Sequence, residues 1–297
     1  MKIKVWGCRG SIPTPSTANF VTSRFGGNTT CMSIRIPGQI IILDGGSGLR
    51  NLGLELAQEK PLKATFFFSH VHWDHIQGFP FFIPCFMPGN SFELWGPKYR
   101  NTPETLLMGS ILENALRWQQ RSLNFPVQLK SMPSQLTFHE ISGGQTVEIQ
   151  GTESKLTIMA EPLQHPGGCM GYRIEEHRGS EVRSIAFCTD TEHLDDPNPS
   201  IQKLAHDADV LFYDAQYTVE EYEGKEGGIS RKGWGHSTWR HGLREALHAK
   251  AKRLLLTHHD PMDDDWMIAR IENEARHEGA KLNIQVDSAF EGMEFEL

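Results

Sequence analysis

The sequence has few cysteines and no long apolar segment. Its 297 residues include five scattered cysteines (Cys8, Cys31, Cys85, Cys169 and Cys188), and no two of them form a C-x-x-C pair. An odd number of dispersed thiols does not suit a disulfide framework and favours free cysteines in a reducing compartment. No apolar stretch approaches the roughly 18 residues that a membrane-spanning helix needs. The N-terminal residues lack the hydrophobic region of a secretory signal, so we expect a cytoplasmic protein.

The sequence also lacks an excess of basic residues. It has 29 Lys and Arg against 37 Asp and Glu, a formal net charge of −8. A protein that coats long nucleic acid needs a basic face, so the charge argues against that class. A small anionic substrate is compatible with this charge, because bound metal ions can reverse the local sign. We find no internal repeat, low-complexity tract or clear linker, and we expect one domain over residues 1–297.

Histidine, in contrast, is abundant, with 14 residues. Four potential metal ligands lie within the segment Ser-His-Val-His-Trp-Asp-His, directly after an apolar run at 64–68 that reads as a buried strand. In extended backbone, His70, His72 and Asp74 project to one side. His75 follows where the chain turns into a helix. Three imidazoles and a carboxylate suit zinc, and also iron or manganese.

Further ligand types follow other predicted strands. Asp44 follows residues 40–43, Asp190 follows 184–188, and His258 follows 253–256, while His165 lies in a His-Pro-Gly-Gly turn. The pattern predicts further strands at 3–5, 32–36, 136–141, 146–149, 155–159, 172–175, 210–213 and 282–286. It predicts helices at 49–58, 103–120 (capped by Thr102), 201–206, 238–249 and 266–277. Strands with interspersed helices in both halves predict an α/β (α+β) protein with two sheets and helices outside.

Several motifs in one order make the chain resemble a metallo-β-lactamase-fold hydrolase. They are Gly-Gly-Asn-Thr at 26–29, Leu-Asp-Gly-Gly at 43–46, the His-x-His-x-Asp-His run, the His165 turn, Cys-Thr-Asp-Thr at 188–191, Gly-His-Ser-Thr at 235–238 and Thr-His-His-Asp-Pro at 257–261. Within that superfamily the chain is similar to the phosphodiesterase branch that includes ribonuclease Z and PhnP-type cyclic phosphodiesterases. The resemblance implies a four-layer αββα sandwich.

The resemblance also implies a site for two divalent metal ions, most readily Zn²⁺, with Mn²⁺ or Fe as alternatives. His70, His72 and His165 would hold one ion, and Asp74, His75 and His258 the other. Asp190 would bridge them and Asp44 would orient a ligand from behind. A hydroxide between the ions would attack the substrate, with Asp74 and His236 as catalytic residues and His236 aiding the leaving group. His259 could exchange roles with His258.

Departures from the ribonuclease Z pattern bear on the substrate. Only 25 positions separate His165 from Asp190, which leaves no room for the long tRNA-clamping arm usual there. We therefore expect a small phosphodiester, such as a cyclic nucleotide or a short oligonucleotide. Residues 79–135 could form a lid or pocket insertion, and the apolar run at 79–87 could be pocket wall, core or the surface of a homodimer. Tyr217, Lys232 and Trp234 could contact substrate or simply belong to a folded loop.

Other functions remain open from the sequence. One is hydrolysis of another ester, a lactone, a lactam or a thioester on the same fold, against which the Gly-His-Ser-Thr turn speaks. A second is a di-iron oxidoreductase or oxygen sensor, although such proteins commonly have Glu where this chain has His72. A third is a metal-bound module without catalytic activity, which the full ligand set disfavours.

Overall fold

Two seven-stranded sheets lie face to face in the computed structural model, which describes residues 1–98, 110–225 and 228–297. The first sheet has the order β14 (Glu294–Glu296), β1 (Lys2–Gly7), β2 (Cys31–Ile36), β3 (Gln39–Leu43), β4 (Lys63–Phe67), β5 (Ser91–Pro97) and β6 (Gln135–Ile141). The second has the order β13 (Gln285–Ser288), β12 (Arg253–Thr257), β11 (Val210–Asp214), β10 (Glu181–Cys188), β9 (Cys169–Arg178), β8 (Lys155–Leu163) and β7 (Thr146–Gln150).

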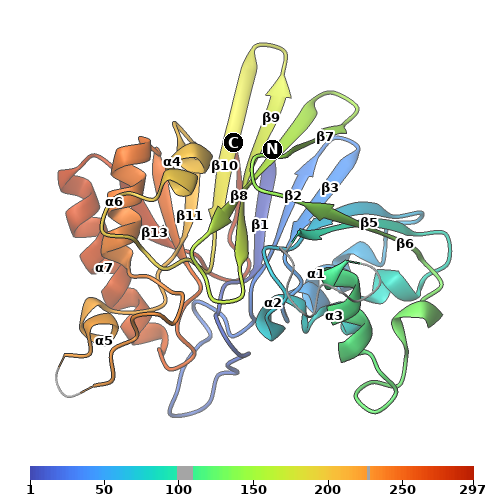
Figure 1. Cartoon of the computed structure of the whole chain (residues 1–297), viewed down its shortest axis with the longest axis horizontal. Coiled ribbons are helices and arrows are strands. Elements are labelled where there is room, and N and C mark those ends of the chain that lie inside the picture. The colour runs from blue at the N-terminus through green and yellow to red at the C-terminus, as the bar shows by residue number, and fades with distance from the viewer. Residues whose placement is uncertain (99–109, 226–227) are drawn as a thin grey trace.

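Helices cover the outer face of each sheet, as Figure 1 shows. The first sheet carries α1 (Leu49–Leu56), α2 (Trp73–Ile76) and α3 (Ile111–Gln119), with short 3₁₀ turns η1 (Phe79–Phe81), η2 (Ile83–Phe86) and η4 (Leu129–Ser131). The second carries α4 (Pro199–Ala205), α6 (Trp239–Ala249) and α7 (Asp265–Lys281), and α5 (Val219–Glu223) lies in the loop before α6. This is the predicted αββα sandwich.

Three hydrophobic cores hold the four layers together. The central core lies between the sheets, and one further core lies under the helices on each side. The fully apolar end of β4 reflects this arrangement: Phe67 enters the central core, while Phe66 and Phe68 face the outer core. A strand buried on both faces reads as a continuous apolar run instead of an alternating one. The five cysteines are free, as predicted, and the structure also buries all five.

Several sequence-based boundaries are wrong. The predicted strand at 282–286 is displaced, because α7 continues to Lys281 and β13 begins at Gln285. Strands β5 and β14 and helix α5 were not predicted. A single helix over 103–120 is also wrong, because Ser110 has extended backbone and its side chain caps α3 by accepting a hydrogen bond from the Glu113 amide. The predicted cap at Thr102 lies outside the described residues.

The apolar run at 79–87 mainly belongs to the outer core of the first sheet. Phe79, Phe82 and Cys85 are fully buried there, and both phenylalanines pack edge-on against Phe66. Phe81 and Ile83 are exposed. The part of the chain that the structure describes contains no helix both long and apolar enough to cross a membrane.

Candidate metal centre

All seven predicted ligand residues meet at one edge of the two sheets. Their donor atoms form two groups, each with donors within 4.8 Å of one another: His70, His72 and His165, and Asp74, His75, Asp190 and His258. The first sheet contributes the segment that follows β4. The second contributes residues that follow β8, β10 and β12. The site therefore depends on strand ends from both sheets.

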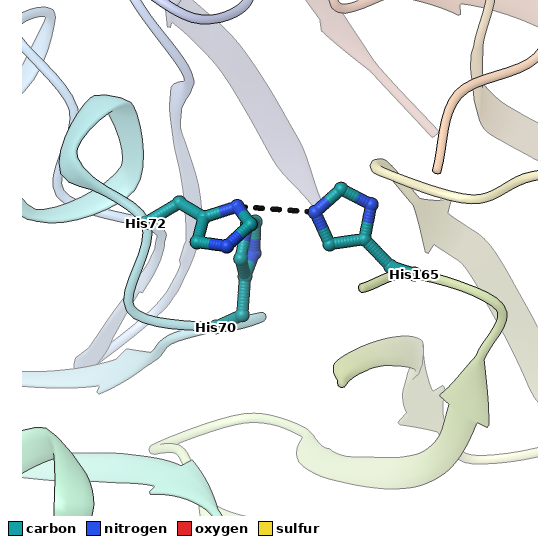
Figure 2. Close-up of side chains that lie close together, drawn as sticks. All are labelled: His70, His72 and His165. Atoms are coloured by element: carbon teal, nitrogen blue, oxygen red, sulfur yellow. Dashed lines mark hydrogen bonds between the residues drawn. The ribbon is translucent and has the colours of Figure 1, made fainter. Parts of the chain in front are cut away.

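The first group consists of three imidazoles that lie close together, with their ring planes at steep angles to one another, as Figure 2 shows. The Nδ1 atom of His72 lies 3.1 Å from the Nε2 atom of His165. His70 and His165 are buried, whereas His72 is exposed. Three neutral imidazoles at this spacing present lone pairs to a common centre, which is an arrangement suited to a divalent transition metal.

The second group is fully buried and mixes imidazoles with carboxylates. The Nε2 atom of His258 lies 3.1 Å from an oxygen of Asp190 and 3.2 Å from an oxygen of Asp74. The Nε2 atom of His75 lies 3.2 Å from the other Asp190 oxygen. Nitrogen and oxygen donors of this kind again suit zinc, manganese or iron.

Asp190 lies between the two groups. Besides its contacts with His75 and His258, its Oδ2 atom is 3.6 Å from the Nε2 atom of His70 and 4.0 Å from that of His165. One carboxylate therefore reaches the donors of both groups.

Three of the histidines make a hydrogen bond on the side of the ring that points away from the other donors, and this bond determines which ring nitrogen points toward them. The Nδ1 atoms of His75, His165 and His258 lie 2.8–2.9 Å from an Asp44 oxygen, the Gly235 carbonyl and the Gln216 amide oxygen, respectively. Each partner is an acceptor, so each Nδ1 carries the proton and donates. In the neutral ring the lone pair then resides on Nε2, which points at the cluster. Metal-binding histidines are characteristically oriented by such outer partners.

The charges in the cluster also suit a cation. Burial by itself lowers the pKa of His258, but the carboxylates of Asp190 and Asp74 outweigh it and raise that pKa to about 10. Burial likewise opposes ionisation of Asp190, yet His258, His75 and His70 hold its pKa well below the usual range. The Nε2 atom of His70 is buried and has no hydrogen-bond partner. An unpaired buried nitrogen beside carboxylates fits a site that holds metal ions.

Three residues at strand ends have left-handed backbone. The φ angles are 58° for Asp44, 50° for Asp190 and 62° for His258, although none of them is glycine. Such conformations are uncommon for residues with a Cβ and gather at functional sites, where the surrounding structure compensates for the strain. Each turn directs a polar side chain from a strand end into the cluster.

Asp44 supports the cluster without joining either group. Its Oδ1 accepts a hydrogen bond from the Ser69 amide, and its Oδ2 accepts from the Ser69 hydroxyl and from His75 Nδ1. The Ser69 hydroxyl also lies 3.0 Å from His70 Nδ1. One buried carboxylate thus orients a histidine in each group.

Replacing Asp44 by asparagine is expected to weaken metal binding about 10- to 100-fold, the usual effect of losing an outer partner of a ligand. Asparagine tolerates the left-handed backbone but offers only one acceptor atom. Competition with a chelator measures the dissociation constant, and Asp195→Asn, at an exposed position, is the matched control. Equal metal affinity in both variants would show that Asp44 has no orienting role.

His236 lies beside the cluster and is held by a carboxylate that sequence reasoning missed. Its Nδ1 is 2.8 Å from an oxygen of Asp214, and its ring stacks on His258 at 4.8 Å between centroids. Asp214 is fully buried at the end of β11 and also accepts hydrogen bonds from the amides of Thr191, Gln216 and Ser237. The signal was available, because Asp214 directly follows the predicted strand at 210–213, just as Asp44 and His258 follow theirs.

The remaining candidates differ in position. His259 points away from the cluster, since its Nε2 contacts the Ala289 carbonyl and its ring packs against Phe25. Tyr217 is buried against the His236 ring at 5.9 Å. Trp234 is half exposed and packs with Arg231, while Lys232 lies near Tyr222. Of the three loop residues, the structure brings only Tyr217 next to His236.

Comparison with known proteins identifies relatives of the expected kind. Ribonuclease BN of Cronobacter sakazakii is 27% identical over 73% of this chain and 77% of its own length. Ribonuclease Z of Exiguobacterium sibiricum is 27% identical over 84% of this chain and 88% of its own. A solved diphosphatase of the PhnP family has the same fold, with a TM-score of 0.66 and 18% identity over 100% of this chain and 97% of that one.

These matches confirm the predicted resemblance, the fold and the class of metal-dependent hydrolase. The family model described as "Beta-lactamase superfamily domain" matches residues 41–259, which include every residue of the two donor groups. Because this match covers well over half of the chain, the protein belongs to the β-lactamase superfamily.

Proposed function

We propose that the protein is a dinuclear metal-dependent phosphodiesterase that cleaves a small phosphodiester, such as a cyclic nucleotide or a short oligonucleotide. The observation that carries the proposal is Asp190, whose two oxygens reach the donor nitrogens of both groups. A carboxylate in that position suits two neighbouring cations better than one. The names of the relatives, ribonuclease and diphosphatase, also denote cleavage of a bond to phosphorus.

In this proposal His70, His72 and His165 hold one divalent ion, and Asp74, His75 and His258 hold the other, with Asp190 shared. Such a pair of ions supplies a hydroxide nucleophile near neutral pH and neutralises charge on the phosphate during displacement. The protein residues fix the ligand geometry through Asp44, Gly235 and Gln216. Asp74 is itself fixed by the Ser11 amide, which donates to its Oδ2 at 2.7 Å.

His236 is the proposed proton donor to the leaving alkoxide. Asp214 accepts a hydrogen bond from the Nδ1–H group, so Nε2 is the atom that exchanges a proton. This role places Asp214 as a positioning residue, which holds the tautomer and stabilises the protonated ring. His236 also lies within ligand distance of His165 and Asp190, so the alternative is that it binds metal.

Two features support a small substrate over tRNA. The stretch between His165 and Asp190 forms the β9–β10 hairpin of the second sheet. Its turn is tight, because Arg178 at the end of β9 already pairs with Glu181 at the start of β10. It carries no inserted arm. The net charge of −8 also disfavours binding of a long polyanion such as tRNA, because a basic surface is what attracts the phosphate backbone. The metal is proposed to be Zn²⁺, with Mn²⁺ or Fe as alternatives.

The test compares metal-free protein with protein reloaded separately with zinc, manganese or iron. We expect bis(p-nitrophenyl) phosphate and a cyclic nucleotide to be hydrolysed only by reloaded protein. A lactone, a thioester and a β-lactam form the control panel. Absence of metal-dependent activity on every phosphodiester would overturn the proposal, and turnover confined to the control panel would favour another hydrolase. Preferential cleavage of a pre-tRNA trailer would contradict the proposal of a small substrate and identify RNA as the substrate.

A further inference from the structure

A pocket of about 630 Å³ adjoins the metal centre between α2 and α3. His70 and His72 line both the pocket and the first donor group, and Gly167 and Gly168 of the His165 turn complete this end. A group held in the pocket therefore lies directly beside the proposed reaction site. Its volume is in the range of pockets that take small organic ligands. Figure 1 shows α2 and α3 on the same outer side of the first sheet.

The two pocket walls carry apolar side chains, among them two indole rings, beside the polar side chains of Gln77, Asn114, Gln119 and Asn124. The α2 side provides Val71, Trp73 and Ile76, and the α3 side provides Ile111, Ala115 and Trp118. Trp73 is 81% exposed and Trp118 is 47% exposed. Within the described part of the chain neither indole packs against another aromatic ring. Exposed tryptophans that face one pocket are unusual unless a ligand or partner covers them.

Helix α3 separates its two apolar faces clearly. Leu112 and Leu116 are buried in the outer core. Of the other apolar residues of this helix, Ile111, Ala115 and Trp118, Ala115 also packs partly against that core. These three residues, spaced by four and three, form a second stripe that lines the pocket. Trp73 belongs to the His-x-His-x-Asp-His run at 70–75, where it lies between the proposed ligands His72 and Asp74. The backbone that carries this indole is thereby part of the segment that carries the proposed metal ligands.

The charge of the pocket differs from that of the whole protein. Apart from the histidines, Arg121 is the one ionisable side chain among its described lining residues, and no carboxylate is among them. The protein as a whole carries a net charge of −8. An acidic protein with an aromatic pocket that lacks carboxylates and contains a guanidinium suits a ligand that is flat, apolar on its faces and attached to an anion.

We propose that this pocket binds the planar aromatic group of the substrate, a nucleobase of a small phosphodiester, which stacks on Trp118 with Trp73 as the second wall. The identity of the substrate as a phosphodiester rests on the proposed function. Stacking on an indole accepts any base, because every base has a π face. The pocket therefore selects nucleotides over diesters with small aliphatic groups, without selecting one base.

The kinetic test uses two diesters with the same leaving group, thymidine 5′-(p-nitrophenyl phosphate) and methyl p-nitrophenyl phosphate. The wild-type protein is expected to have the higher kcat/KM for the thymidine ester. Trp118→Leu keeps apolar bulk and removes the flat ring, and is expected to reduce this preference roughly tenfold, the scale of losing one stacked base. Trp118→Phe is expected to retain most of it. Trp266→Ala, at an exposed tryptophan on α7, is the matched control.

A binding measurement separates this proposal from the proposed function. Calorimetry with metal-free full-length protein and thymidine 5′-monophosphate is expected to show roughly tenfold weaker binding in Trp118→Leu than in Trp266→Ala. If neither ester is hydrolysed but nucleotide binding depends on Trp118, the result supports the proposed base pocket and contradicts the proposed phosphodiesterase activity. If both esters are hydrolysed with equal efficiency and Trp118→Leu changes neither preference nor binding, the pocket is refuted and the phosphodiesterase stands. The base pocket is also refuted if the Trp118 variants keep both the preference for the thymidine ester and the nucleotide affinity of the wild-type protein. It is refuted as well if the wild-type protein binds no nucleotide.

Discussion

Replacing Asp190 by asparagine is expected to lower kcat/KM for bis(p-nitrophenyl) phosphate about a thousandfold. Asparagine removes the charge but tolerates the left-handed backbone at this position (φ 50°), so the turn is preserved. The two oxygens of this carboxylate reach donors in both ligand groups. Two-metal sites supply several kcal/mol of charge stabilisation in the transition state, and each 1.36 kcal/mol is tenfold in rate.

The same variant should retain less metal. Metal analysis after gel filtration is expected to give about two ions per chain for the wild-type protein and fewer for Asp190→Asn. Asp195→Asn, at an exposed position on the loop after β10, is expected to match the wild-type protein in both measurements. Full activity in Asp190→Asn at normal metal content would contradict the shared role of this carboxylate.

Replacing His236 by alanine is expected to reduce activity according to the leaving group. For a cyclic nucleotide, whose leaving alkoxide needs a proton, the loss should be about 100-fold or more, the range for general acid catalysis. For bis(p-nitrophenyl) phosphate the loss should be small, because nitrophenolate leaves without protonation. Steady-state kinetics on both substrates give the ratio of the two losses.

Two comparisons distinguish a proton donor from a metal ligand. Asp214→Asn leaves the His236 ring in place but removes the charged acceptor of its Nδ1 proton, so it should show the same dependence on leaving group to a lesser degree. Metal content should be normal in His236→Ala. Equal losses on both substrates together with missing metal would assign His236 to the metal centre instead.

The ligand segment after β4 could be predicted from the residues alone, because its ligands are close together in sequence and alternate along extended backbone. His165, Asp190 and His258 are far apart in sequence. Strand-end position suggested them, and the family resemblance assigned them. Asp214 was missed although it also ends a strand, because its partner His236 comes next to it only through the packing of β11 against the turn before α6.

The pocket illustrates a different limit. The spacing of Leu107, Ile111, Ala115 and Trp118 predicts an apolar helix face, yet an apolar face can pack into a core or line a cavity. Leu107 lies outside the described residues. Leu112 and Leu116 fill the core, and the other three residues of the predicted face line the pocket. The opposite holds for the run at 79–87, whose Phe79 and Phe82 are buried under α1. Only the tertiary arrangement distinguishes these two uses of apolar residues.

The division of the ligands between the two sheets has a mechanical consequence. His70, His72, Asp74 and His75 belong to one half of the sandwich, and His165, Asp190 and His258 to the other. Cations bound by both sets act as reversible cross-links between segments that meet only in the folded chain. A ligand whose free concentration is a thousand times its dissociation constant adds about 4 kcal/mol to the free energy of unfolding. In a chain whose cysteines are all free, the proposed metal ions would thus provide the cross-links that disulfides provide in other proteins.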